Sequence, residues 1–173
     1  LSLSLSALSL STLSTRSALF SMTPLMRACR YGGQDSEECV RMLLLAERGE
    51  EGGGVNDVDV DGNTALAFAC FKSKPGVVQL LLEGGSNVNA MNHNGHTPLM
   101  SACMGPAATG GEGGEGGKED DEGFQRVEEC VRLLLLCKAD ASLTNREGET
   151  ALDKASKSAV PRSVLLLLLG NST

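Results

Sequence analysis

The 173-residue chain has no tryptophan, one tyrosine and four phenylalanines, so large aromatic side chains cannot dominate its core. The core must be built from Leu, Val, Ala, Met and Cys, which suits helices packed closely on small residues better than an aromatic-rich β-sandwich. A basic surplus is also missing, because the formal net charge is -7. Nucleic-acid backbones attract basic surfaces, so this charge balance disfavours nucleic-acid binding.

Long apolar runs are absent as well. Runs such as Val164 to Leu169 are far shorter than the roughly 18 apolar residues that cross a bilayer, so we expect no membrane span. Residues 1–20 contain only Leu, Ser, Ala, Thr, one Arg and one Phe, and no acidic residue. Their Leu-Ser alternation favours a low-complexity, disordered segment, and the alternative interpretation is the remnant of a targeting peptide.

One short phrase occurs four times and organises the rest of the chain. Each copy begins with Thr, followed by Pro or Ala and then by Leu, and a second phrase in which Val precedes a run of Leu comes later. The shortest interval, 33 residues from Thr64 to Thr97, defines the uninterrupted unit. The intervals from Thr23 to Thr64 and from Thr97 to Thr150 are 41 and 53 residues, so both contain added segments.

Each unit is predicted to contain a turn and two helices. Residues 59–62, 92–95 and 145–148 begin with Asp or Asn and end with Gly, as expected for tight turns in which Gly has a positive φ. The Thr then caps a first helix, and Pro fits its first turn. Leu and Ala, two and five residues after the Thr, share one face. The second phrase predicts a buried second helix.

This pattern resembles the ankyrin repeat, in which a β-turn finger and two antiparallel helices recur near a 33-residue period. The resemblance covers residues 22–169 and implies an all-α solenoid of about four helix-turn-helix repeats. These repeats are expected at about residues 22–62, 63–95, 96–148 and 149–173, within a domain of residues 21–173. The family's signature His is replaced by Met26, Ala67, Met100 and Asp153. The hydrogen bonds that this His makes to neighbouring turns are therefore not implied here.

The six cysteines could indicate a disulfide framework, but their positions in the repeat argue against it. Cys29, Cys70 and Cys103 each follow the starting Thr by six residues, and Cys39 and Cys130 both precede Val-Arg. Repetition of the same packing positions predicts reduced, structural cysteines, with at least Cys70 and Cys103 buried. Reduced cysteines indicate a cytoplasmic or nuclear protein, and organelle targeting by residues 1–20 is the alternative.

Candidate residues for catalysis, cofactor binding or metal binding are lacking. The two histidines, His93 and His96, flank a turn glycine and are interpreted as exposed turn residues rather than as half of a metal site. The Gly-rich stretches 52–54 and 110–117 are not followed by the Lys-Ser/Thr of a phosphate loop. We therefore expect a chain with no cofactor, no metal and no enzyme activity.

The segment 105–123 is rich in Gly and in acidic residues. Such a composition cannot bury apolar area, so this insert into the third repeat is expected to be disordered and dispensable for folding. A second interpretation gives it an electrostatic contact with a basic partner.

Partner binding in the ankyrin family usually occurs on the concave face, which is formed by the turn tips and the first helices. The resemblance therefore implies a non-catalytic protein–protein interaction module, or alternatively a substrate-recruiting part of a larger enzyme such as a ubiquitin ligase or kinase. The positions that match the concave face are Arg30, Tyr31, Val60, Asp61, Asn63, Phe71, Lys72, His93, Asn94, His96, Met104, Arg146, Glu147, Glu149 and Lys157.

The last second-helix phrase differs from the others because it has no polar residue in its Leu run. A helix that is apolar on all sides is normally buried on all sides, and terminal repeats normally carry a polar outer face. We therefore expect the run to be covered by a further repeat, a partner or a second copy of the chain. This run consists of Leu165, Leu166, Leu167, Leu168 and Leu169.

Overall fold

The computed structural model describes residues 22–33, 35–47, 54–105, 119–158 and 160–170. Within these ranges all regular structure is helical, with no β-strand, as expected for an all-α repeat fold. The helices are α1 (Pro24–Tyr31), α2 (Ser36–Glu47), α3 (Ala65–Phe71), α4 (Pro75–Glu83), α5 (Pro98–Met104), α7 (Glu119–Leu136), α8 (Ala151–Lys157) and α9 (Arg162–Gly170).

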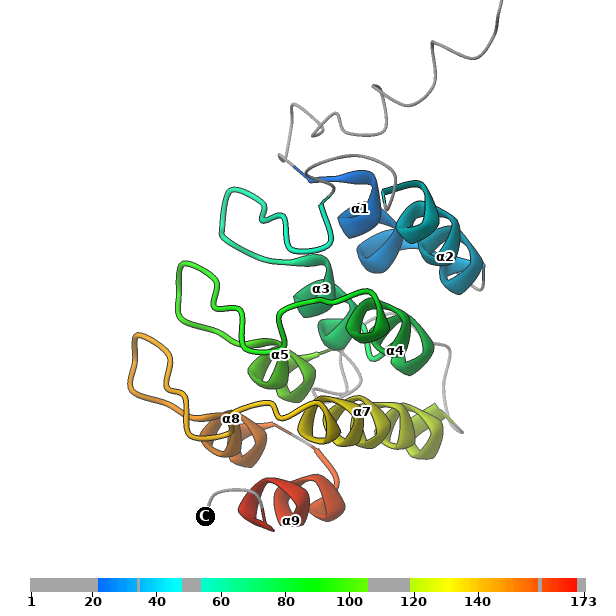
Figure 1. Cartoon of the computed structure of the whole chain (residues 1–173). Helices are drawn as coiled ribbons and strands as arrows, with labels where there is room; N and C mark the ends of the chain where they lie inside the picture. Colours follow the sequence, from blue (N-terminus) through cyan, green and yellow to red (C-terminus); the bar gives the residue numbers. More distant parts are fainter. Residues whose placement is uncertain (1–21, 34, 48–53, 106–118, 159, 171–173) are drawn as a thin grey trace, which may run out of the picture.

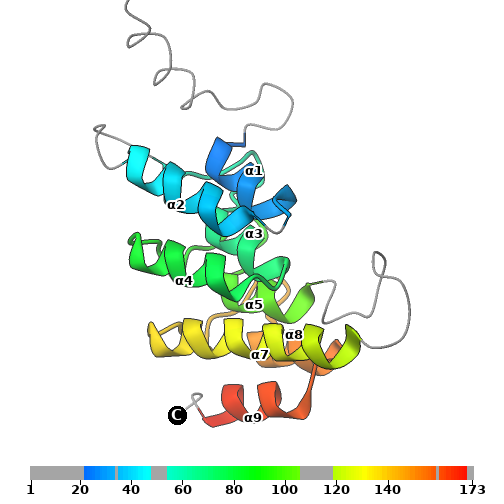
Figure 2. The same ribbon diagram turned by 90° about the vertical axis from the view of Figure 1, so that its right-hand side faces the viewer.

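The helices pair along the chain, α1 with α2, α3 with α4, α5 with α7 and α8 with α9. The first members of the pairs stack in the order α1, α3, α5, α8, and the second members stack beside them in the order α2, α4, α7, α9. Figure 1 shows the loops that precede α3, α5 and α8 projecting from the same side of the stack. Figure 2, turned by 90°, shows the second helices as successive layers.

Each first helix begins where the repeated Thr predicts. The Oγ1 atom of Thr23 accepts a hydrogen bond from the N–H of Met26 at 3.2 Å, and Thr64 and Thr97 cap α3 and α5 in the same way. Thr150 also caps α8, and the Asp153 carboxylate bonds back to the Thr150 N–H, which completes a capping box. Thr side chains thus satisfy N–H groups that have no partner within a helix.

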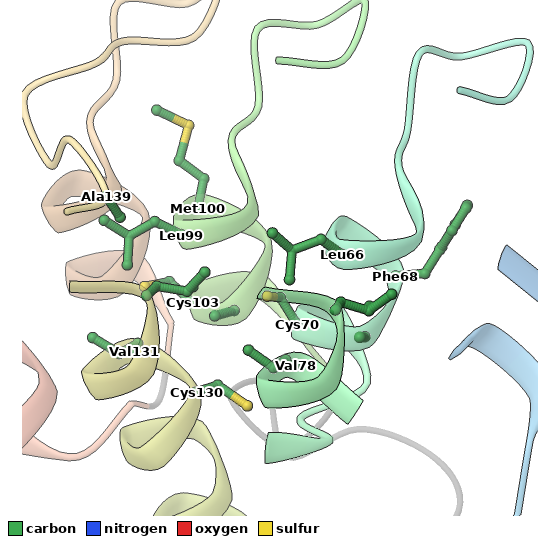
Figure 3. Packing of buried hydrophobic residues seen from close by; sticks show 14 of the residues in the cluster. Leu66, Phe68, Cys70, Val78, Leu99, Met100, Cys103, Cys130, Val131 and Ala139 are labelled. Carbon is green, nitrogen blue, oxygen red and sulfur yellow. The ribbon is translucent and has the colours of Figure 1, made fainter. Parts of the chain in front are cut away.

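The core runs along the stack between the two rows of helices, as the close view in Figure 3 shows. Leu66 and Leu99 occupy equivalent positions two residues after the capping Thr, and both are buried. Small Ala and Cys side chains lie on the same helices, and among the described helices α3 and α5 share the most extensive contact. Small side chains at the contact let neighbouring helix backbones approach closely.

None of the six cysteines is in a disulfide, as the repeat positions predicted, and Cys29, Cys70, Cys103 and Cys130 are buried. Burial raises the pKa of the Cys103 thiol and of the Cys130 thiol to about 12 each. Burial is also the main cause that raises the pKa of the Cys70 thiol. The nearby Cys130 sulfur raises it further.

Cys39 differs from its counterpart Cys130 because it is exposed. Figure 3 shows the Cys130 side chain pointing from α7 toward the preceding helix pair, which carries Cys70 and Val78. Cys39 belongs to the first pair of the described part, which has no preceding pair in that part. The same position in the repeat therefore differs in burial according to its neighbours.

The third helix pair departs from the expected boundaries of the insert. Helix α7 begins at Glu119, so residues 119–123 are helical although the segment 105–123 was expected to be disordered. Extending an existing helix is easy compared with nucleating one, and α7 already has the strongly helical phrase that ends at Leu136. Gly105 is buried at the end of α5. Residues 106–118 and the segment 1–20 lie outside the described residues.

The terminal Leu run is partly covered by the fold itself. Leu168 is buried, and Leu165 and Leu167 pack in part against the core. The expectation that the whole run needs an external cover is therefore wrong for these three residues, because α9 packs on α7 and α8. Leu166 and Leu169 remain 61% and 53% exposed, and an external cover for them stays a prediction. No helix in the described ranges is both long and apolar enough to cross a bilayer.

The burial of the cysteines predicts a two-step thiol titration. Under native, reducing-agent-free conditions only Cys39 and Cys137 should react rapidly with a thiol reagent, because they are exposed. After denaturation all six thiols should react. Fewer than six reactive thiols in denaturant would contradict the assignment of free cysteines, and six in the native state would contradict the burial.

Gly105 lies at the C-terminal end of α5, where the backbone comes close to the C-terminal end of α3. A Cβ atom at this position would lie 2.1 Å from the backbone oxygen of Phe71, at the end of α3. We expect Gly105→Ala to lower the free energy of unfolding by about 1–3 kcal/mol through overpacking, as measured by urea denaturation. Gly33→Ala is the matched control, since no atom lies within 4 Å of a Cβ there. Equal stability of the two variants would refute the close packing.

Candidate functional site

The three loops that project from the stack share one hydrogen-bonded turn. In the first, the Asp59 Oδ1 atom accepts from the N–H groups of Asp61 and Asn63 at 3.0 and 2.8 Å. Asn92 and Asn145 make the same pair of bonds in the second and third turns. Each turn ends at a glycine with φ between 77° and 80°, which is a left-handed conformation that glycine adopts without strain.

Successive turns are hydrogen-bonded to each other. The His93 N–H donates to the Asp61 carbonyl at 2.8 Å, and the Arg146 N–H donates to the Asn94 carbonyl at 3.0 Å. A side-chain bond from Asn92 Nδ2 to Oδ1 of the preceding turn's Asn63, 2.8 Å long, adds to the first connection. These bonds hold the turns in register although the signature His of the resemblance is replaced. The replacing residues Met26, Ala67 and Met100 are buried instead.

A groove of about 350 Å³ lies between the turns and the first helices. It brings together seven residues that the sequence predicted for the concave face and four that it did not. The predicted ones are Arg30, Asp61, Asn63, Phe71, Lys72, His96 and Met104, and the additional ones are Ala67, Phe68, Asn92 and Ser101.

The missed helical residues lie on the same face as the predicted ones. Phe71 and Met104 follow their capping Thr by seven residues, whereas Phe68 and Ser101 follow it by four. Residues three apart are neighbours on a helix surface, so this spacing was the signal that could have identified Phe68 and Ser101. Asn92 could have been identified as the first residue of its turn.

The other predicted residues lie outside the groove. Tyr31 is 65% exposed at the end of α1. Val60, His93, Asn94 and Arg146 are exposed in the turns. Glu147, Glu149 and Lys157 belong instead to an ion cluster of the last helix pair.

This ion cluster is internally paired. The Glu149 carboxylate forms ion pairs with Lys154 and with Lys157, and Lys154 also lies 3.3 Å from a carboxylate oxygen of Glu147. Hydrogen bonds from Lys154 and then from Lys157 hold the pKa of Glu149 well below its usual range. The same pairing raises the pKa of Lys154, with Glu149 as the main cause.

Asn145 connects the ion cluster to the groove. Its Nδ2 atom donates to Glu149 Oε2 at 3.0 Å and lies 3.2 Å from the Nε2 atom of His96, which lines the groove. Since Nδ2 carries only donor hydrogens, this contact favours a neutral His96 with an unprotonated Nε2. Burial lowers the pKa of His96, and the positive charge of Lys154 lowers it further.

Two cations on the helical side of the groove lie against aromatic rings. The guanidinium carbon of Arg30 is 5.2 Å from the ring centre of Phe68 and 5.3 Å from that of Tyr31. The Nζ atom of Lys72 is 5.9 Å from the ring centre of Phe71. All three distances are within the range of cation–π attraction. In the described ranges, no group of three His, Cys, Asp or Glu side chains is placed to hold a metal ion.

Comparison with known proteins identifies the repeated unit. The family model described as "Ankyrin repeats (3 copies)" matches residues 25–109. Residues 25–109 are ankyrin repeats. The match covers α1 to α5, and α7, α8 and α9 continue the same alternation of first and second helices beyond the ankyrin match.

Three curated proteins illustrate the similarity of this ankyrin-repeat chain. It is 30% identical over 147 residues, 84% of its length, to the E3 ubiquitin-protein ligase KEG of Arabidopsis thaliana. It is 30% identical over 81% of its length to the human BCL-6 corepressor-like protein 1, and 36% identical over 42% to mouse Synphilin-1. The aligned part spans only 7%, 6% and 8% of these proteins, respectively.

The lowered pKa of His96 predicts a pH-dependent stability. Because the folded-state pKa lies below the ordinary value of 6.5, the unfolded state binds more protons below that pH, so stability falls as pH decreases through this window. We expect His96→Gln to reduce the loss of thermal stability between pH 7 and pH 5.5, since an amide cannot acquire the charge.

The exposed His93, in the same turn, supplies the control for this experiment. His93→Gln removes one histidine and leaves the contact between Asn145 and His96 in place. It should therefore retain the pH dependence of the unsubstituted chain. Identical pH dependence in the His96→Gln variant and the unsubstituted chain would show that His96 does not contribute.

Proposed function

We propose that this chain is a non-catalytic protein–protein interaction module that binds its partner at the groove. Ankyrin repeats bind other proteins, and the observation that carries the proposal is the groove itself. It gathers side chains from α1, α3 and α5 and from two turns onto one surface. Side chains contributed by separate repeats form a binding surface whose chemistry can vary without altering the scaffold.

The proposed module consists of four repeats with turn fingers, one repeat for each helix pair. The four Thr caps at equivalent positions support this count. The recurring turns at Asp59, Asn92 and Asn145 support the assignment of fingers to the second, third and fourth repeats. Each finger then presents its tip beside a first helix, where a partner would contact both.

A second candidate function is substrate recruitment for a larger enzyme. The similarity to an E3 ubiquitin-protein ligase over 84% of this chain supports it. In that arrangement the groove would still bind a protein, and a catalytic domain would act on the bound protein. The two functions differ in the fate of the partner, which would be released unchanged in one and modified in the other.

We also propose that the module works in the cytoplasm or nucleus. The six free cysteines support a reducing compartment, because exposed Cys39 and Cys137 would be open to oxidation elsewhere.

Photo-crosslinking from the groove tests the interaction function. A benzophenone amino acid in place of Met104, which lines the groove, should give discrete covalent adducts with a partner protein in cells that produce the chain. Adding Phe71→Glu, which places a charge on the groove wall, should abolish these adducts. The measurement is denaturing electrophoresis followed by mass spectrometry of the adducts.

The matched control carries the same amino acid in place of Gln79, an exposed residue of α4. This position lies on a second helix and should give no such adduct. Equal adducts from both positions, or adducts that persist after Phe71→Glu, would contradict binding at the groove. Circular dichroism of each variant establishes that the helices are retained.

A further inference from the structure

The helical side of the groove carries positive charge that no ion pair among the described residues neutralises. Arg30 and Lys72 line its helical side, and the exposed Arg27 lies three residues before Arg30, on the same face of α1. None of the ion pairs within the described residues includes any of these three side chains. A cationic patch of this kind opposes the overall charge of the chain, which is -7.

In the last helix pair, by contrast, cations at the equivalent repeat positions are paired. Lys154 and Lys157 follow their capping Thr by four and seven residues, as Arg27 and Arg30 do in α1. Both lysines are paired with Glu149, which immediately precedes its cap, Thr150. The corresponding residue before Thr23 is Met22, which is buried in the core. The same backbone positions thus carry neutralised cations at one end of the stack and available cations at the other.

The aromatic contacts position the groove cations without using their hydrogen-bond donors. A ring face attracts the Arg30 guanidinium but offers no lone pair in the plane of its N–H groups. Those N–H groups, in their planar fork, remain able to bind a carboxylate through two parallel hydrogen bonds. Lys72, beside Phe71, is available in the same way as a point charge.

The remaining walls of the groove restrict how an occupant lies. Phe71 is 38% exposed and, with Met104, offers an apolar surface next to the cations. On the turn side, Asp61 carries a negative charge, and the lowered pKa keeps His96 uncharged at neutral pH. A carboxylate is therefore attracted to the helical side and repelled from the turn side.

From this charge complementarity we propose that the groove binds an acidic peptide segment of a partner protein. One carboxylate of the segment pairs with Arg30 and Lys72, and an adjacent apolar side chain packs on Phe71 and Met104. This inference rests on the proposed protein-binding function and specifies the chemistry of the partner.

Selection from a random library of displayed 12-residue peptides on the immobilised full chain tests the proposal. We expect the selected peptides to be enriched in Asp or Glu next to Leu, Ile or Phe. The tightest of them, made as a blocked fluorescent peptide, should bind at least about tenfold more weakly to the Arg30→Glu/Lys72→Glu variant by anisotropy, because charge complementarity becomes charge repulsion. The milder Arg30→Gln/Lys72→Gln variant should show a smaller loss in the same direction.

The matched control is Arg41→Glu/Arg126→Glu, which changes the net charge equally on the exposed second helices α2 and α7. It should alter the affinity by less than about twofold, because exposed charges away from the site act weakly through salt-containing solvent. Thermal unfolding of every variant shows whether the stack is intact.

Three results would overturn the proposal. The first is no enrichment at all, and the second is enrichment of acidic peptides whose affinity is unchanged in the Arg30→Glu/Lys72→Glu variant. The third is enrichment of basic or purely apolar peptides that lose affinity with Phe71→Glu, in which case the groove binds proteins as proposed but the partner is not acidic. Photo-crosslinked adducts at Met104 that persist when the charge-reversal variant is used would lead to the same conclusion.

Discussion

Each helix pair in the described part of the chain buries its apolar face against neighbouring pairs, and the stacked arrangement depends on that constraint. Helix α3 has seven residues, of which the six from Ala65 to Cys70 are buried. An isolated helix of this length is unstable in water, since even Ala-rich helices need about 12–15 residues. Helix α3 persists because α1 and α5 pack against it on either side. The requirement for close packing selects small side chains at the contact and an unsubstituted backbone at Gly105.

The predictable part of this fold has a local chemical cause. Thr caps, Pro at the first helical positions and Asp or Asn before Gly act within a few residues, so the sequence located four first helices and three turns. The start of α7 was placed too late, because the composition of residues 119–123 predicted disorder while the adjoining helix extends into them. The exposure of Cys39 depends on whether another helix pair packs beside it. The residues adjacent to Cys39 in the sequence give no information about such a neighbour.

The groove illustrates the same limit at the level of side chains. Arg30, Phe71, Met104 and Lys157 occupy one position of the repeat, seven residues after the cap. The position within the repeat would therefore predict all four as binding residues. Only the three-dimensional arrangement shows that Lys157 is bound to Glu149 whereas Arg30 lies over Phe68. The repeated backbone places these four side chains at equivalent positions. The side chains around each position then determine whether it is available to bind a partner.

The hydrogen bonds between successive turns have a mechanical consequence. The bond from His93 to Asp61 and the bond from Arg146 to Asn94 connect neighbouring turns one after another along the stack. Tension applied along the stack therefore loads these connections in series, and the weakest interface yields first while the others keep their register. Each interface involves only adjacent helix pairs, so a pair that separates would keep intact neighbours on which it could repack. Separation of one helix pair would therefore leave the hydrogen bond between the other two turns in place.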